Sequence, residues 1–500
     1  MARFVPSEYQ IDIFNNFRKT KKNIVVQAVP GSGKTTTIIE LIKYVPPGKQ
    51  SIFLAFNNST VVHLKKKVYT THTPVLTLHS LGCKAIYKYY GGNVEKNDFK
   101  IFRIAKNLAT QNKWDVPKDK LNAYLFNIQK IVTLFRLNNE SDFGAIEDII
   151  NYHDIDTIGG EIEHSIQTID AMYAYNKSMS KSSSRKFEID FCDMIWLPVF
   201  NSRIKMQTYD IVFVDEIQDL NAVQQALIDK IMHANSRFVA VGDPRQSIYG
   251  FLASDLKSYE NFKSRTNTIE LPLSYCYRCG TEIVKMVNQV YNVVKSPDDM
   301  HSGEVIDDGN FDDIQEGDFV LCRNNAPLAE LYFDFIEKEM PCYIKGSEIG
   351  KSIINTVKEY SGNTKKQTIK NIEGKLAEIY SELKAKGIKK PKKHPKYYNL
   401  YEKLLVFGVI ALKYNTMKDI IDAIERMFKD VGNGIVLSSG HKSKGLEADN
   451  VYLYRMGLIP SEYATQPWQI EQEENLRYVM MSRARKKLIF VGGVHIQNNE

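Results

Sequence analysis

The segment AVPGSGKT at residues 28–35 constrains this chain more than any other feature. It follows the apolar run NIVVQ and precedes TTIIELIKYV, which has the apolar spacing of a helix. A strand, a glycine-rich turn and a helix in this order form a phosphate-binding loop. Gly31 and Gly33 let backbone N–H groups turn towards phosphate oxygens, and the helix N-terminus adds its dipole. We therefore expect a nucleotide site in which Lys34 reaches the β- and γ-phosphates and Thr35 holds Mg²⁺.

The acidic motif DEIQD at residues 215–219 fits the same site. It follows IVFV, a continuous apolar run that is typical of a buried parallel strand. Asp215 and Glu216 therefore stand at the carboxyl end of a strand, where open α/β sheets bind ligands. We expect Asp215 to hold Mg²⁺ and Glu216 to activate the attacking water. A chance glycine-rich turn and a solvated acidic turn would not explain both motifs in this order.

Composition sets broad limits on the class of protein. The chain has 500 residues, enough for about three or four domains. No apolar run approaches the ~20 residues of a membrane span, and the N-terminus lacks a secretory apolar core. Six scattered cysteines predict reduced thiols in the cytoplasm, and Cys276 and Cys279 have no second pair with which to bind zinc. The net charge of +7 is a mild indication of a polyanionic partner.

Two sets of strand-like runs, separated by helical patterns, predict an α/β chain with two parallel sheets. The runs lie at 23–29, 51–56, 74–78, 211–216 and 237–243, and then at 267–272, 318–323, 434–439, 450–456 and 487–493. A helical pattern interrupts each set, for example over 120–137. We predict a first sheet domain over 1–85 and 187–266 with a helical insertion over 86–186, and a second over 267–350 and 432–500 with a short insertion over 351–431.

The second insertion is rich in lysine. Residues 351–400 contain thirteen Lys and four Glu, and the densest part is KAKGIKKPKKHPK at 384–396. One interpretation is a solvated, flexible loop. The other is a contact with the phosphate backbone of a nucleic acid, which needs charge but no particular sequence.

Further motifs follow in a fixed order, and together they resemble those of the UvrD/PcrA/Rep group of superfamily 1 helicases across both sheet domains. The matching segments are PSEYQIDIF (6–14), LAFNNST (54–60), TLHSLG (77–82), IDFCDMI (189–195), VGDPRQSIYGF (241–251), LSYCYR (273–278), FVLCRNN (319–325), SGHKSKGLEAD (439–449) and EENLRYVMMSRARKKL (473–488). The resemblance implies two RecA-like domains of the phosphate-loop class, each with an inserted, mainly helical subdomain.

The resemblance also implies roles around ATP and Mg²⁺. It places nucleotide contacts at Gln10, Gly31, Ser32, Gly33, Lys34, Thr35, Thr36, Tyr277 and Glu447. Gln10 would read the adenine, Tyr277 would stack on it, and Glu447 would meet the ribose. Gln246 would couple the γ-phosphate to DNA, while Arg278 and Arg483 would act as arginine fingers. Catalysis would therefore involve Lys34, Glu216, Gln246, Arg278 and Arg483.

For DNA, the resemblance implies contacts at Phe56, Asn57, His79, Tyr249, Phe251 and His441. From the residue types alone, Phe56 and Phe251 can equally be core residues, and His79 a turn histidine. The implied activity is 3′→5′ movement on single-stranded DNA and unwinding at junctions with duplex, because VGDPRQSIYGF has the form found in the UvrD-like branch.

Two other classes of function stay open. One is a helicase-like subunit that mainly partners a nuclease in repair, recombination or phage defence. The expected protein partner is a nuclease or a protein of replication or repair. The other is a DNA-binding module with a degenerate ATPase, although the intact Lys34, Glu216, Gln246 and Arg483 disfavour it. In each case we expect a cytoplasmic protein, associated with the nucleoid or active in an infected cell.

Overall fold

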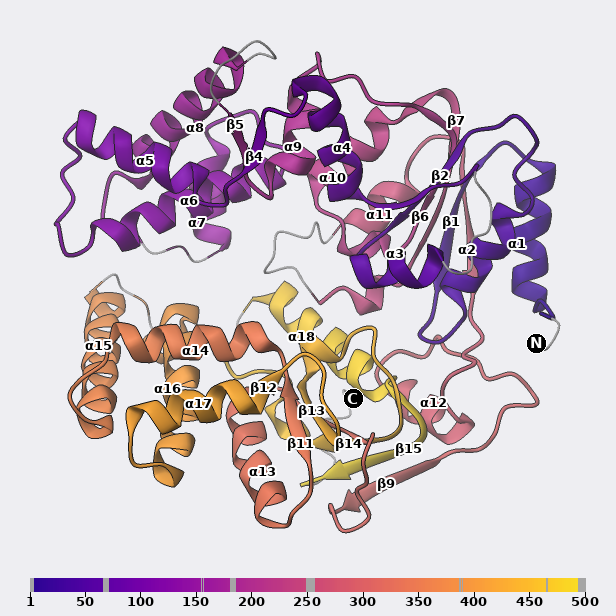
Figure 1. Cartoon of the computed structure of the whole chain (residues 1–500). Helices are drawn as coiled ribbons and strands as arrows, with labels where there is room; N and C mark the ends of the chain where they lie inside the picture. The colour runs from indigo at the N-terminus through magenta and orange to yellow at the C-terminus, as the bar shows by residue number, and fades with distance from the viewer. Residues whose placement is uncertain are drawn as a thin grey trace. The chain divides into compact units, whose positions relative to one another are not determined.

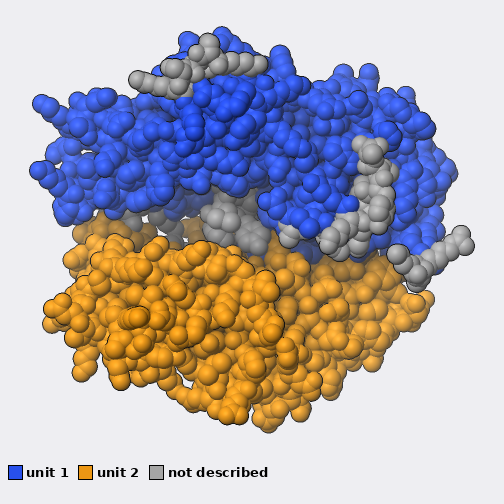
Figure 2. Space-filling model, viewed as in Figure 1, with its two compact units in different colours: residues 1–28, 33–273 blue, residues 29–32, 274–500 orange. Residues whose placement is uncertain are grey.

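The structure is a computed structural model that describes residues 4–65, 72–153, 155, 157–179, 186–248, 257–385, 388, 390–464 and 466–492. It divides into two compact units, coloured separately in Figure 2. The first comprises residues 1–28 and 33–273, and the second comprises residues 29–32 and 274–500. Each unit is built on a parallel sheet of its own (Figure 1), so the predicted fold class is confirmed.

The first sheet has six strands in the order β3-β2-β6-β7-β1-β8, all paired in parallel. They are β1 (Asn23–Ala28), β2 (Ser51–Ala55), β3 (Val75–Thr77), β6 (Tyr209–Val214), β7 (Met232–Gly242) and β8 (Thr268–Leu273). The central strands are almost wholly apolar because helices cover both faces. One face packs against α1 (Glu8–Lys19), α2 (Lys34–Ile42) and α3 (Asn58–Lys65). The other packs against α4 (Leu78–Tyr90), α9 (Asp193–Phe200), α10 (Ala222–Lys230) and α11 (Ser258–Lys263).

The last strand of this sheet differs from the sequence-based prediction. The run at 267–272 was expected to open the second domain, but β8 pairs with β1 from Asn23↔Thr268 to Ala28↔Leu273. The strand lies at the edge of the sheet, where the missing N–H of Pro272 is tolerated. The first unit therefore extends to Leu273 and does not end at residue 266.

The insertion in the first unit is mainly helical. It contains α5 (Lys100–Gln111), α6 (Leu121–Leu137), α7 (Ala145–Tyr152) and α8 (Glu161–Ser178). The pattern at 120–137 thus correctly predicts α6, whose apolar face includes Leu125, Ile128 and Val132, all fully buried. A small parallel pair, β4 (Val94–Lys96) and β5 (Phe187–Ile189), ties the two ends of the insertion together.

The second sheet has seven parallel strands in the order β12-β11-β13-β10-β14-β15-β9. They are β9 (Glu304–Gly309), β10 (Phe319–Cys322), β11 (Cys342–Lys345), β12 (Phe428–Lys429), β13 (Ile435–Ser439), β14 (Ala448–Tyr454) and β15 (Ala484–Val491). The unit's helices are α12 (Thr281–Val287), α13 (Asn325–Glu337), α14 (Ser347–Glu359), α15 (Lys365–Ala385), α16 (Pro395–Lys413), α17 (Met417–Met427) and α18 (Pro467–Met481). The second insertion is therefore a helical layer formed by α14 to α17. None of the described helices is long and apolar enough to cross a membrane.

Candidate active site and nucleic-acid groove

The predicted phosphate loop lies between β1, which ends at Ala28, and α2, which begins at Lys34. Gly31 and Gly33 have φ values of 65° and 80°, a left-handed backbone that glycine adopts without strain. Ser32 is 1% exposed, and its hydroxyl has no hydrogen-bond partner among the described residues. A buried hydroxyl without a partner is uncommon in folded proteins, and it fits a loop that receives a polar ligand such as a phosphate.

The structure brings the two predicted motifs of the first unit together. β6 ends at Val214, so Asp215 and Glu216 lie at the carboxyl edge of the sheet. Lys34 Nζ donates to Glu216 Oε2 at 2.8 Å, and Thr35 Oγ donates to Asp215 Oδ2 at 3.4 Å. These two pairs are the core of the candidate ATPase site. Thr36, the other predicted contact in this turn of α2, is exposed.

Burial and charge act in opposite directions on these groups. Burial tends to lower the pKa of Lys34, but the carboxylates of Glu216, Asp215 and Asp243 more than offset it, so the pKa is raised and the ammonium stays charged. For Asp215, burial and the nearby Glu216 raise the pKa to about 7, against the opposing effect of Lys34. The site is therefore a cluster of three acidic side chains around one charged lysine.

The donor set beside the loop suits Mg²⁺. Mg²⁺ is usually held by one or two carboxylates together with substrate phosphates and waters. Asp215 offers a carboxylate and Thr35 a hydroxyl, on adjacent elements. Within the described ranges no group of three or more His, Cys, Asp or Glu side chains is arranged to hold a metal ion. A hydroxyl and a carboxylate fit a cation whose other ligands are substrate phosphates and waters.

A chain of hydrogen bonds connects Glu216 to Gln246. Gln218 Nε2 donates to Glu216 Oε2 at 2.6 Å, and Gln218 Oε1 accepts from the Asp243 N–H at 3.1 Å. Asp243 Oδ2 in turn accepts from Gln246 Nε2 at 2.8 Å. The sequence motifs contain Gln218 and Asp243, but we did not predict them as site residues. Glu216 itself has a φ of 53°, a conformation that costs a non-glycine residue about 1 kcal/mol and that often marks functional sites.

Gln10, expected to read the adenine, is engaged within the first unit. It is 3% exposed, its Oε1 accepts from the Ser7 N–H at 3.0 Å, and its Nε2 donates to Thr37 Oγ at 3.0 Å. The amide therefore caps α1 and links it to α2 directly behind the loop. The donation to Thr37 uses one of the two N–H groups of the amide, and a role in adenine recognition stays a prediction.

Three predicted nucleotide residues, Tyr277, Arg278 and Glu447, belong to the second unit. Arg278 Nε donates to Glu447 Oε2 at 2.5 Å, and its Nη1 donates to the Ser482 carbonyl at 3.2 Å. The expected arginine finger and the expected ribose ligand are thus an ion pair. The Tyr277 ring is 47% exposed, as a residue that stacks on a base requires.

Arg483 is almost fully buried, with 2% exposure. Its guanidinium donates to the carbonyls of Val479 at 2.8 Å and Leu446 at 3.2 Å, and to the hydroxyl of Ser482 at 2.9 Å. These three bonds fix the position of the guanidinium.

Three of the predicted DNA residues, Phe56, Asn57 and His79, line one groove of about 880 Å³ in the first unit. Phe56 is 38% exposed, and Asn57 is exposed and caps α3 through the Thr60 N–H at 2.8 Å. His79 stacks on Phe191, with ring centroids 4.0 Å apart and planes at 19°. Burial lowers the pKa of His79 to about 4, so the stacked ring is neutral at physiological pH. Phe191, which is 58% exposed, was not predicted; its position between two aspartates of IDFCDMI was the available signal.

Of the other three predicted DNA residues, the structure describes one, His441. Tyr249 and Phe251 lie outside the described residues. His441 lies in the second unit, on the short helix Gly440–Ser443 that follows β13. Burial, Arg323 and two lysines lower its pKa to about 3, so His441 would meet DNA as a neutral donor and not as a cation.

Comparison with known families defines the class of protein. Residues 12–267 match the UvrD/REP helicase N-terminal domain, and residues 330–492 match the UvrD-like helicase C-terminal domain. The chain therefore belongs to the UvrD/Rep family of DNA helicases.

Individual relatives are distant. The chain is 24% identical over 314 residues to the mitochondrial ATP-dependent DNA helicase HMI1 of Saccharomyces cerevisiae, covering 58% of this chain and 41% of that protein. It is 24% identical over 501 residues to F-box DNA helicase protein 1 of Schizosaccharomyces pombe, covering 93% of this chain and 55% of that protein. It is 22% identical over 611 residues to the ATP-dependent DNA helicase Rep of Buchnera aphidicola, covering 93% and 90%. The chain thus spans about half the length of the first two relatives.

Proposed function

We propose that this protein is an ATP-dependent DNA helicase that moves 3′→5′ on single-stranded DNA and unwinds duplex at junctions. The observation that carries the proposal is the pairing of Lys34 with Glu216 and of Thr35 with Asp215 at strand ends of one parallel sheet. It is the arrangement that phosphoryl transfer to water requires: a cation for the phosphates, a hydroxyl and a carboxylate for Mg²⁺, and a second carboxylate for the water.

In this mechanism ATP phosphates take over Lys34 from Glu216, which frees the Glu216 carboxylate for the attacking water. Thr35 and Asp215 would hold Mg²⁺, which would supply positive charge beside the phosphates. Through the hydrogen bonds described above, Gln218 and Asp243 couple the position of the Gln246 side chain to that of Glu216. The second unit would contribute positive charge through Arg278 and Arg483.

The groove at Phe56, His79 and Phe191 supports single-stranded nucleic acid as the substrate. Exposed aromatic rings stack on bases of any sequence, and each stacked base is worth roughly 1–3 kcal/mol. Lys84 and Lys96 line the same groove and can meet phosphates. The groove thus combines the two features that sequence-independent strand binding requires.

Unwinding of duplexes with a 3′ or a 5′ single-stranded tail, with and without ATP, tests the proposal. Strand release only from the 3′-tailed substrate and only with ATP is the expected result. Release only from the 5′-tailed substrate would refute the polarity, and a lack of DNA-stimulated ATP hydrolysis would refute the motor itself.

Both arginines of the second unit should matter for turnover. We expect Arg278→Ala and Arg483→Ala each to reduce DNA-stimulated ATPase by on the order of a hundredfold or more, as for other arginine fingers. Nucleotide affinity should change less than turnover. Arg455→Ala is the control, since this arginine is 47% exposed and pairs with Glu330 on the surface. A loss confined to nucleotide binding would mean that the arginines anchor ATP without acting on the transition state.

The Lys-rich segment gives a separate prediction about duplex contact. Lys390 and Lys392 are exposed, whereas Lys393 donates to the Glu462 carbonyl at 2.7 Å and Lys396 pairs with Glu382 at 3.0 Å; Lys389 lies outside the described residues. If the segment contacts duplex phosphates, Lys390→Ala with Lys392→Ala should flatten the slope of log K against log salt by up to about 1.8, at ~0.9 per contact.

The matched control for this prediction is Lys393→Ala with Lys396→Ala on the same segment, which should change the slope less because both ammonium groups already have protein partners. Binding of a tailed duplex across a salt series provides the measurement. An equal slope for the wild type and both variants would leave this segment as a solvated loop.

A further inference from the structure

Phe191 stands on a turn whose backbone is unusually well fixed. The turn joins β5, which ends at Ile189, to α9, which begins at Asp193. The N–H of Asp190 donates to Asp193 Oδ2 at 3.0 Å, and the N–H of Asp193 donates to Asp190 Oδ1 at 2.7 Å. The N–H of Phe191 donates to Asp98 Oδ1 at 3.0 Å. Carboxylates thus hold the backbone on both sides of an exposed ring.

Two buried cations of the insertion hold those carboxylates. Arg136 of α6 donates to both oxygens of Asp190, at 3.0 and 2.7 Å, and to Asp193 Oδ1 at 3.1 Å. Lys100 of α5 donates to Asp193 Oδ2 at 2.8 Å. Both cations and Asp193 are 0% exposed, and Asp190 is 5% exposed. A planar guanidinium that binds a carboxylate through two parallel bonds fixes its orientation as well as its position.

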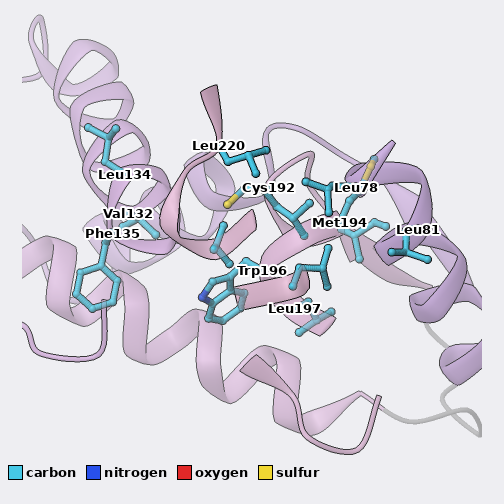
Figure 3. Close-up of a cluster of buried hydrophobic side chains, with 14 of the residues drawn as sticks. Leu78, Leu81, Val132, Leu134, Phe135, Cys192, Met194, Trp196, Leu197 and Leu220 are labelled. Carbon is cyan, nitrogen blue, oxygen red and sulfur yellow. The ribbon is translucent and has the colours of Figure 1, made fainter. Parts of the chain in front are cut away.

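The surroundings of this cluster are apolar. Figure 3 shows Val132, Leu134 and Phe135 of α6 on one side and Cys192, Trp196 and Leu197 of the α9 segment beside them. Leu78 and Leu81 of α4, the helix that carries His79, belong to the same hydrophobic cluster. Ion pairs buried among apolar side chains add little net stability, since desolvation offsets their attraction, but loss of one partner leaves an uncompensated buried charge.

The geometry points to a role in DNA binding: we propose that three residues of the first insertion hold Phe191 in the orientation in which a base stacks on it. Lys100 and Arg136 are positioning residues that act through Asp190 and Asp193. Asp98 is a positioning residue that acts directly on the Phe191 N–H. The inference rests on the proposed function, because it requires that the groove accepts single-stranded DNA. It assigns the insertion a part in binding the single strand, separate from any contact with duplex.

A double-mutant cycle between Arg136→Lys and Phe191→Ala tests this role. Each single variant should weaken binding of a fluorescent oligothymidylate by about tenfold, the loss expected for one stacked base. In the Phe191→Ala background, Arg136→Lys should cause no further loss, because the ring through which Arg136 acts is already absent. In DNA-stimulated ATPase assays Arg136→Lys should raise the KM for DNA and leave kcat unchanged.

Two further variants keep the test decisive. Asp98→Ala changes an exposed residue, so it should fold even if Arg136→Lys does not, and its effect should likewise vanish in the Phe191→Ala background. Arg103→Ala is the control: this residue of α5 pairs with Glu188 at 2.6 Å on the surface of the same insertion, and its loss should leave DNA affinity unchanged.

The outcomes separate the inference from the function on which it rests. If Phe191→Ala weakens binding but Arg136→Lys and Asp98→Ala do not, the positioning role is wrong and the groove assignment stands. If Arg136→Lys causes the same fold loss with and without Phe191, the arginine has a general structural effect and the positioning role is again wrong. If Phe191→Ala binds DNA normally, base stacking on Phe191 is refuted together with the positioning role.

Discussion

Replacing Lys34 with alanine is expected to reduce DNA-stimulated ATP hydrolysis by about a thousandfold or more. Each preorganised donor that stabilises the charge of a transferring group is worth roughly 10²–10³ in rate. The ammonium group of Lys34 is such a donor, and the carboxylates of Glu216, Asp215 and Asp243 keep it charged by raising its pKa. The substitution therefore removes the cation for the phosphates and leaves acidic groups that repel them. Steady-state ATPase assays with and without oligonucleotide provide the measurement.

Lys43→Ala is the matched control for that experiment. Lys43 directly follows α2, its side chain is 61% exposed, and it pairs with Glu40 at 2.6 Å. A surface pair of this kind contributes roughly 0–1 kcal/mol to stability, so the control variant should retain its ATPase activity. Near-normal turnover in Lys34→Ala would refute the assignment of the nucleotide site. Urea titration of both variants would show whether loss of activity in Lys34→Ala is accompanied by unfolding.

The sequence was sufficient to predict the parts of the site that depend on local order. A strand followed by a glycine-rich turn and a helix has few possible geometries, so the loop before Lys34 could be derived from residue types alone. Parallel strands place their carboxyl ends on one edge, so the approach of Asp215 and Glu216 to the loop could be derived as well. These two rules place the loop near Asp215 and Glu216, but the particular Lys34–Glu216 and Thr35–Asp215 pairs were not predicted.

Contacts between charged residues far apart in sequence could not be predicted in this way. Lys100 and Arg136 lie on amphipathic helices, where charged residues are normally solvated. Their burial depends on Asp190 and Asp193, which are more than fifty positions away from Arg136, and no local pattern connects the two segments. The position of Phe191 was missed although two neighbouring aspartates were a local signal, because its backbone partner Asp98 lies at the other end of the insertion.

Edge strands were another source of error, and the short internal strand β11 was missed as well. The residue types of β8 do not show to which of the two sheets it belongs. Its pairing with β1 assigns it to the first unit. β9 and β12 lie at the two edges of the second sheet, and half-exposed or very short strands show little apolar pattern. Central strands such as β6 and β13 were predicted because burial on both faces leaves a continuous apolar run.

Replacing Glu216 with glutamine should separate nucleotide binding from hydrolysis. Glutamine keeps the shape of the side chain and a carbonyl oxygen that can accept from Lys34 and Gln218, the two partners of the carboxylate. It cannot take a proton from the attacking water, and loss of a general base costs roughly 10²–10⁴ in rate. We therefore expect ATP and DNA affinities close to those of the wild type, with turnover reduced by about a hundredfold or more.

The same substitution should change how nucleotide binding depends on pH. Burial, and then the charge of Glu216, raise the pKa of Asp215 to about 7, so a fraction of wild-type molecules carries a protonated Asp215 at neutral pH. Because a divalent cation requires the carboxylate, wild-type affinity for Mg²⁺–ATP should fall as the pH drops through 7. Glu216→Gln removes one of the two causes of the raised pKa, which should then lie lower and move the loss of affinity to more acidic pH. Titration of a fluorescent ATP analogue between pH 5.5 and pH 8, a range of about one to two pH units on either side of 7, would show the shift. Superimposable pH profiles for wild type and variant would indicate that Asp215 and Glu216 do not share the site in solution.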